Sequence, residues 1–177
     1  MSDAEFRAAF EQNQDSVYRF AWRMCGSAAA AEDIAQEVFL TLLRQPGRFD
    51  PARGALRSFL LAVARNLALK RWREEYRLDG LGDGLEDQVT ILPVDLESQE
   101  TSDAVGAAVA SLPPLQREVL ILAEYEDLPL EEIARAVDAE VGTVKSRLFR
   151  ARENLRRTLA PLKSRNIGRS ISHGTIR

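Results

Sequence analysis

The chain has 177 residues, of which 24 are Lys or Arg and 27 are Asp or Glu, so its formal net charge is −3. The single cysteine, Cys25, excludes an internal disulfide, and the single histidine, His173, leaves almost no material for a zinc site. We therefore expect neither a metal nor a cofactor. The apolar runs are too short to cross a bilayer and the N-terminus does not resemble a secretion signal, which favours a cytoplasmic protein.

The charge is distributed unevenly along the chain. Residues 141–177 carry 10 basic residues and one acidic residue, whereas residues 76–112 carry one basic and eight acidic residues. Residues 113–140 are also acidic, with two basic and eight acidic residues. The small net charge therefore conceals a strongly basic C-terminal segment, which favours a nucleic-acid partner.

Apolar residues recur at helical spacing in three N-terminal stretches. The first predicted helix ends at Gly26, and the second runs from its cap, Ser27, to a stop at Pro46. The third covers residues 56–72. The loop between the second and third helices, residues 45–54, is longer than the packing of two helices requires.

The composition changes after the third helix. Residues 79–102 contain glycines, Pro93 and scattered acids without a helical period, and we assign residues 77–103 to a flexible acidic linker. Beyond it we predict a short helix near residues 104–110 and helices around residues 115–124, 130–137 and 141–159. The predicted fold class is all-α, with two small helical bundles at residues 1–76 and 104–162 joined by that linker. A basic tail at residues 163–177 is expected to be disordered.

The last two predicted helices form a helix-turn-helix motif, with Asp138 in a left-handed turn and Thr143 as a candidate cap. The polar first turn of the second helix would enter the major groove of DNA. Its basic and aromatic side chains suit base edges and thymine methyl groups, and its remaining arginines suit phosphates. The candidate DNA-binding residues are Thr143, Lys145, Ser146, Arg147, Phe149, Arg150 and Arg152. A solvated basic helix is the alternative, and the motif does not by itself separate a repressor from other helix-turn-helix proteins.

Four segments together resemble the extracytoplasmic-function (ECF) sigma factors of bacterial RNA polymerase. They read AAEDIAQEVFLTLLR (30–44), LRSFLLAVARNLALKRWRE (56–74), LPPLQREVLILAEYEDLPLEEIARAV (112–137) and VGTVKSRLFRARENL (141–155). The resemblance covers two blocks, roughly residues 5–75 and 104–160. The blocks occur in the order that the family has, with a short linker between them as in the family.

The resemblance implies roles for the N-terminal bundle. One face of the second helix would dock on the polymerase, through Glu32, Asp33, Gln36 and Glu37; without the resemblance this face reads as ordinary solvated surface. The loop would capture a base flipped out of the promoter −10 element, and the third helix would bind that element. The residues concerned are Arg48, Phe49, Arg53, Arg57, Arg65, Asn66, Lys70, Arg71 and Arg73. Phe49 is equally a candidate core anchor, and the linker either threads the polymerase cleft or only tethers the two bundles.

The resemblance implies a sigma factor that directs promoter-specific transcription initiation. Its partners would be core RNA polymerase, double-stranded and melted promoter DNA, and an anti-sigma protein. The −35 element would be read by the C-terminal helix-turn-helix. The alternative is a helix-turn-helix regulator that works without polymerase. We do not expect an enzyme, because the acids are predicted to lie on solvated faces or in the linker and no phosphate-binding loop or nucleophile elbow is present.

Overall fold

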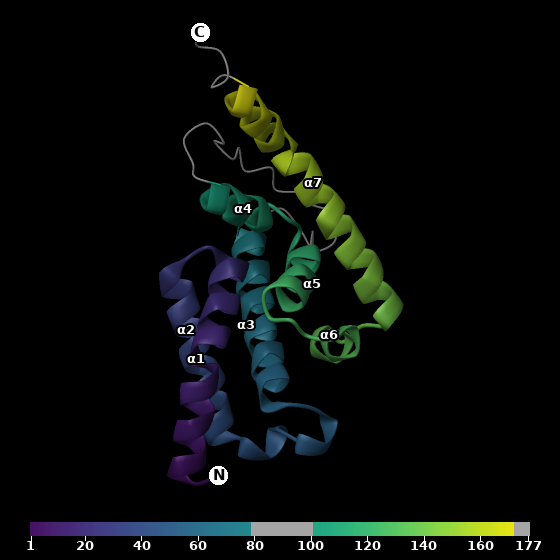
Figure 1. The fold of residues 1–177 in the computed structure, drawn as a ribbon. Helices are drawn as coiled ribbons and strands as arrows, with labels where there is room; N and C mark the ends of the chain where they lie inside the picture. Colours follow the sequence, from purple (N-terminus) through teal and green to yellow (C-terminus); the bar gives the residue numbers. More distant parts are fainter. Residues whose placement is uncertain (79–100, 172–177) are drawn as a thin grey trace.

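The computed structural model describes the backbone of residues 1–78 and 101–171 and, within those ranges, the side chains of residues 1–78 and 104–161. All regular elements in these ranges are helices, which confirms the all-α fold class (Figure 1). They form an N-terminal bundle and a C-terminal bundle. The assigned linker lies outside the described residues except at its two ends, which belong to helices.

The N-terminal bundle consists of α1 (Asp3–Cys25), α2 (Ala28–Arg44) and α3 (Leu56–Leu78). Ser2 and Glu5 form a reciprocal capping box at the start of α1, which ends at Gly26 with φ of 68°, a left-handed conformation that glycine adopts without strain. The Ser27 side chain caps α2 by accepting a hydrogen bond from the Ala30 N–H at 3.3 Å. The predicted end of α1 and the predicted cap of α2 are confirmed.

The loop between α2 and α3 has regular structure of its own. It contains two 3₁₀ turns, η1 (Pro46–Arg48) and η2 (Pro51–Arg53), and each begins with a proline. The Asp50 side chain accepts a hydrogen bond from the Ala52 N–H at 2.9 Å and so caps the second turn. Gly54, with φ of 149°, lets the chain turn into α3.

The C-terminal bundle consists of α4 (Thr101–Ala110), α5 (Pro114–Glu124), α6 (Leu130–Val137) and α7 (Val141–Ile171). Asp138 joins α6 to α7 with φ of 52°, so the predicted left-handed turn is confirmed. The predicted cap is wrong. The Val144 N–H bonds to the Glu140 carbonyl at 3.1 Å, so the helical ladder has already begun before Thr143, which lies in the first turn.

The C-terminal tail differs from its prediction. Helix α7 continues to Ile171, so residues 163–171 of the basic tail are helical and not disordered. Adding residues to an existing helix avoids the cost of nucleation, and composition alone does not report that advantage. Residues 172–177 lie outside the described residues.

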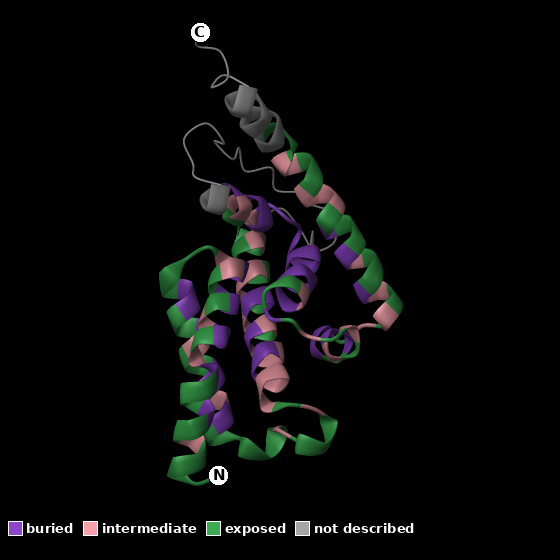
Figure 2. Cartoon of the chain, viewed as in Figure 1, coloured by how far each residue is buried: buried purple, intermediate pink, exposed green. Residues whose placement is uncertain are grey.

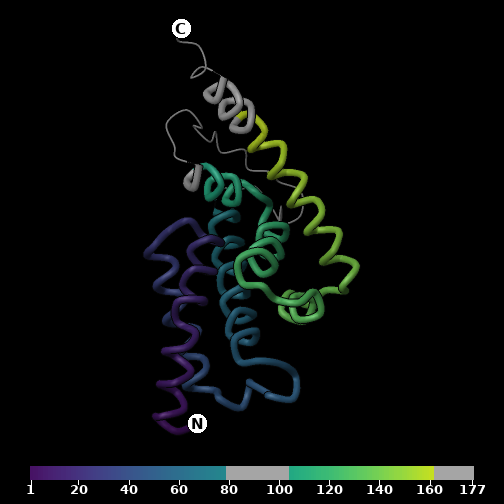
Figure 3. The backbone as a smooth tube through the Cα atoms, in the orientation of Figure 1, coloured from purple at the N-terminus to yellow at the C-terminus, as the bar shows by residue number. Residues whose placement is uncertain are grey.

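The two bundles lie against each other. Helix α5 packs between the N-terminal bundle and α7, contacting α1 on one side and α7 on the other (Figure 3). Residues 114–122 of α5 are all buried (Figure 2). The buried apolar side chains of both bundles form one continuous cluster. Among the described residues no helix has the length and apolar character needed to cross a membrane.

Candidate nucleic-acid interface

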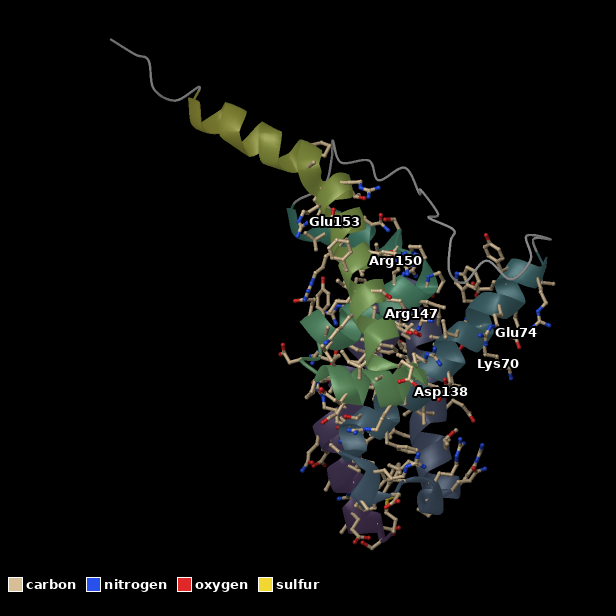
Figure 4. The ribbon with its side chains drawn as sticks, turned by 90° about the vertical axis from the view of Figure 1, so that its right-hand side faces the viewer. Lys70, Glu74, Asp138, Arg147, Arg150 and Glu153 are labelled. Atoms are coloured by element: carbon tan, nitrogen blue, oxygen red, sulfur yellow. The ribbon has the colours of Figure 1, made fainter. Side chains whose placement is uncertain are left out.

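Helix α7 presents part of its predicted DNA-reading set to solvent. Lys145 and Arg150 are exposed, and 66% of the surface of Phe149 is accessible, which is unusual for a large apolar side chain. Ser146 is exposed too, and its hydroxyl donates to the Thr143 carbonyl at 3.0 Å. Figure 4 shows Arg150 along α7, after the turn marked by Asp138. These four side chains are therefore accessible from solvent, as a DNA-reading surface requires.

Two other arginines of this set are engaged within the protein. The Arg147 side chain is only 15% exposed, and its Nη1 lies 3.9 Å from Oε1 of the buried Glu118 on α5. Arg152 is exposed but forms an ion pair with Glu124, with its Nε 3.0 Å from Oε1. Arg147 therefore holds α7 against α5 instead of lying on the solvent-facing stripe.

The predicted base-capture loop contributes to a cavity of about 240 Å³. Arg48, Phe49 and Arg53 line it from the loop, while Glu132 and Arg135 of α6 line it from the C-terminal bundle. The Phe49 ring is half-buried, with its centre 5.7 Å from that of Phe59. Phe49 thus packs on the edge of the core and also faces the cavity, so both roles considered for it are compatible with its position.

Helix α3 divides the remaining predicted −10 residues between solvent and protein contacts. Asn66, Lys70 and Arg73 are exposed, and Figure 4 shows Lys70 on α3 to one side of α7. Arg71 lies between two carboxylates, 3.5 Å from Asp33 and 3.4 Å from Glu75. The exposed members are accessible from solvent, whereas Arg71 is engaged by two acidic side chains.

The predicted polymerase-docking face is accessible on α2. Glu32, Asp33, Gln36 and Glu37 are all exposed. Asp33 and Glu37 also line a shallow groove of about 410 Å³ together with residues of α3, including Lys70. This groove therefore carries both acidic and basic side chains.

Arg57 and Arg65 of α3 point at the C-terminal bundle. Nε and Nη2 of Arg65 donate to the two carboxylate oxygens of Glu118, at 2.6 and 3.0 Å. Arg57 pairs with the Glu126 carboxylate, and its Nη1 donates to the Glu126 carbonyl at 2.8 Å. The Ser16 hydroxyl of α1 completes the second cluster by donating to Glu126 at 2.6 Å. Two predicted DNA-binding guanidinium groups are therefore held in contacts between the bundles.

The acids in these contacts correct a prediction. Glu118 and Glu126 are 0% and 1% exposed, so they do not lie on solvated faces. Burial raises the pKa of the Glu118 carboxyl, although the hydrogen bonds from Arg65 act in the opposite direction. The apolar run Val119–Ala123 could have indicated this burial. A helix that is apolar on all sides is buried, and the charged residues next to such a run are buried with it.

Arg117 joins the two bundles through backbone groups. Its guanidinium donates to the carbonyls of Met24 at 2.6 Å, Leu112 at 2.8 Å and Ala110. Burial lowers the pKa of Arg117 to about 10, and its Nε has no hydrogen-bond partner. The cation lies at the C-terminal ends of α1 and α4, where the helix dipoles are negative.

No group of His, Cys, Asp and Glu side chains in the described part of the chain has an arrangement that could hold a metal ion.

Comparisons with known proteins match both bundles. The family model for sigma-70 region 2 matches residues 9–78, and the model for sigma-70 region 4 matches residues 102–155. The ECF RNA polymerase sigma factor SigW of Bacillus subtilis is 35% identical over 161 residues, covering 84% of this chain and 86% of SigW. The ECF sigma factor SigE of Mycolicibacterium smegmatis is 34% identical over 155 residues, covering 84% of this chain and 59% of SigE.

Two solved structures share the fold. The sigma factor RpoE of Bartonella quintana, in complex with the anti-sigma factor NepR, aligns with a TM-score of 0.70 at 25% identity, covering 88% of this chain and 97% of RpoE. CnrH, in complex with the cytosolic domain of CnrY, aligns with a TM-score of 0.67 at 20% identity, covering 90% of each chain.

Proposed function

Because the chain belongs to the ECF sigma factors of bacterial RNA polymerase, we propose that it binds core polymerase and directs it to a specific set of promoters. It acts by recognition and has no catalytic activity of its own, and its place of action is the cytoplasm, where polymerase and promoters meet. The observation that carries this proposal is the presence of both sigma modules in one chain, each with an exposed polar face outside the shared core.

The division of labour follows the two bundles. Residues 1–76 dock on polymerase through the acidic face of α2 and bind the −10 element through the loop and α3. Residues 104–162 read the −35 element through α7, where Lys145 and Arg150 donate to base edges and Phe149 contacts a thymine methyl group. The exposure of these three side chains supports this assignment. The linker connects the two modules over one promoter.

We also propose that an anti-sigma protein regulates this chain. The related RpoE of Bartonella quintana aligns with this chain over nearly its whole length. It was solved with such a partner. The closeness of the two bundles supports a partner that contacts both, because one protein can then bind exposed surfaces of each module at once.

In vitro transcription tests the function. Core polymerase is incubated with a library of genomic fragments, with and without this protein, and the transcript starts are sequenced. We expect new starts that share two upstream motifs and depend on this protein. A variant with Lys145→Ala and Arg150→Ala is the matched control, and it should lose these starts while still binding core polymerase. Starts that do not change when the protein is added would refute the function.

A further inference from the structure

The contact between the bundles joins basic residues of the N-terminal bundle to acidic residues of the C-terminal bundle. We refer to these bundles as region 2 and region 4, after the family models that match them. On the region 2 side lie Arg57 and Arg65, both assigned above to −10 DNA. On the region 4 side lie Glu118 and Glu126, both fully buried. We call these two ion pairs, together with the contact between Ser58 and Glu132, the clasp.

The clasp reproduces the chemistry of a phosphate contact. A guanidinium binds a carboxylate or a phosphate through the same two parallel N–H donors, and Arg65 already uses Nε and Nη2 on the two oxygens of Glu118. Its side chain is 14% exposed in this arrangement. Arg65 therefore cannot bind a DNA phosphate until Glu118 releases it.

The C-terminal bundle also covers the base-capture loop. Glu132, Arg135 and Ala136 of α6 form one wall of the cavity that Phe49 faces. The Arg135 side chain lies 4.0 Å from the position that a Cβ at Gly54 would occupy, so α6 approaches the loop closely. A flipped base would therefore have to enter a cavity that the C-terminal bundle of the same chain partly encloses.

Contacts away from the DNA-binding residues hold the same closed arrangement. The Arg23 guanidinium of α1 lies 4.0 Å from the ring centre of Tyr125, a cation–π contact between the bundles. Arg117 donates to the Met24 carbonyl of α1. Opening the bundles breaks all of these contacts together, so the closed form is a defined state and not a loose approach of two tethered modules.

We propose that region 4 is an intramolecular inhibitor of region 2: Glu118 and Glu126 occupy the guanidinium groups that bind −10 DNA, and the bundles must separate before promoter binding. This inference rests on the proposed function. Glu118 contacts both Arg65 and Arg147, so one buried carboxylate holds a −10 residue and the promoter-reading helix at once. Separation frees Arg65 and leaves the pair between Glu118 and Arg147 within region 4.

The inference has a quantitative consequence. The apparent dissociation constant for DNA equals the intrinsic constant divided by the fraction of protein that is open. When the open form is rare, a variant with a tenfold larger open fraction binds about tenfold more tightly, which corresponds to about 1.4 kcal/mol. The DNA-binding residues themselves stay unchanged in such a variant.

The test changes only the acids of region 4. The full-length double variant E126Q/E132Q removes two clasp charges with side chains of nearly the same shape. The matched control, D127N/E131Q, makes the same change of charge at the neighbouring positions, which are exposed. Asparagine is suitable at position 127, where φ is 51°, because it tolerates the left-handed conformation. Circular dichroism verifies that both variants keep their helices.

Two measurements are made on the free proteins. The first is the affinity for a short fluorescent single strand of random sequence, to which the phosphate-binding groups of region 2 contribute; the basic residues of α7 are the same in both variants. The second is the rate of alkylation of Cys25, the only cysteine, which lies in a pocket lined by Pro114 and Arg117 of region 4. We expect E126Q/E132Q to bind the strand about tenfold more tightly than the control and to be alkylated faster.

Each other outcome overturns the inference. Equal gains in both variants would mean that net charge alone changed the affinity. Unchanged affinity with faster alkylation would mean that the bundles open without releasing DNA-binding residues, and unchanged values in both measurements would mean that the clasp does not hold them closed. The transcription assay keeps this test apart from the proposed function: an active parent protein without a clasp effect refutes only the inhibition.

Discussion

Replacing Arg117 by methionine tests how the chain holds its two bundles. The change removes a buried guanidinium that donates to the carbonyls of Met24, Leu112 and Ala110. Each carbonyl left without a donor costs about 2 kcal/mol, or about 6 kcal/mol for the three. Part of this loss is regained, because the fold no longer has to bury the charge.

The size of that regained part follows from the pKa of Arg117. Burial lowers it from 12.5 to about 10, and each unit corresponds to 1.36 kcal/mol, so burying the charge costs about 3 kcal/mol. The expected net loss of unfolding free energy is therefore about 3 kcal/mol for Arg117→Met. For Arg117→Lys we expect a smaller but clear loss, because one ammonium group cannot reach carbonyls at the ends of two helices.

Urea denaturation followed by circular dichroism measures these changes. Arg19→Met is the matched control, because Arg19 is exposed on α1 and the same change there should alter stability by less than about 0.5 kcal/mol. An Arg117→Met variant as stable as the control would refute the reasoning, since it would mean that the three carbonyls gain nothing from the cation. An Arg117→Lys variant as stable as the parent would show that the positive charge stabilises the fold and that the planar arrangement of the guanidinium donors does not.

Three further outcomes are expected. Lys145→Ala combined with Arg150→Ala should lower promoter binding by the holoenzyme about 30-fold or more, at about 1–3 kcal/mol for each base contact, in a filter-binding assay; an unchanged affinity would remove both from the reading surface. Asp33→Arg should weaken association with core polymerase in a pull-down while costing less than about 1 kcal/mol of stability, because its pair with Arg71 is exposed; full retention of polymerase would exclude this docking site. Burial raises the pKa of the Cys25 thiol more than Arg71 and Arg117 lower it, so less thiolate is present at a given pH and alkylation should need a higher pH than for a solvated cysteine. A midpoint at or below the ordinary value would contradict this.

The helices and their boundaries were largely predictable, because they depend on local chemistry. Gly26 and Ser27 mark the change from α1 to α2, and Asp138 adopts the left-handed turn expected of it. The exposed part of the site was predictable for the same reason: the basic and aromatic stripe of α7 follows from helical spacing. Thr143 was misjudged because the helix begins where the Glu140 carbonyl accepts a hydrogen bond from the Val144 N–H.

The partners of the charged residues were not predictable in this way. Arg65 and Glu118 are 53 residues apart in sequence, and Arg57 and Glu126 are 69 apart. Helical spacing places a side chain on a face of its own helix but does not say which other helix covers that face. Arg65 was therefore assigned to DNA without any sign of the carboxylate that holds it.

The sequence by itself determined that this chain is helical, that its basic charge gathers at the C-terminal end and that it carries two modules of a sigma factor. These properties depend on residue type and on spacing within one helix. Only the tertiary structure decided that the modules lie against each other and that Glu118 and Glu126 are buried between them. Burial and ion pairing depend on which surfaces meet, and that is settled by the packing of α5 between the N-terminal bundle and α7.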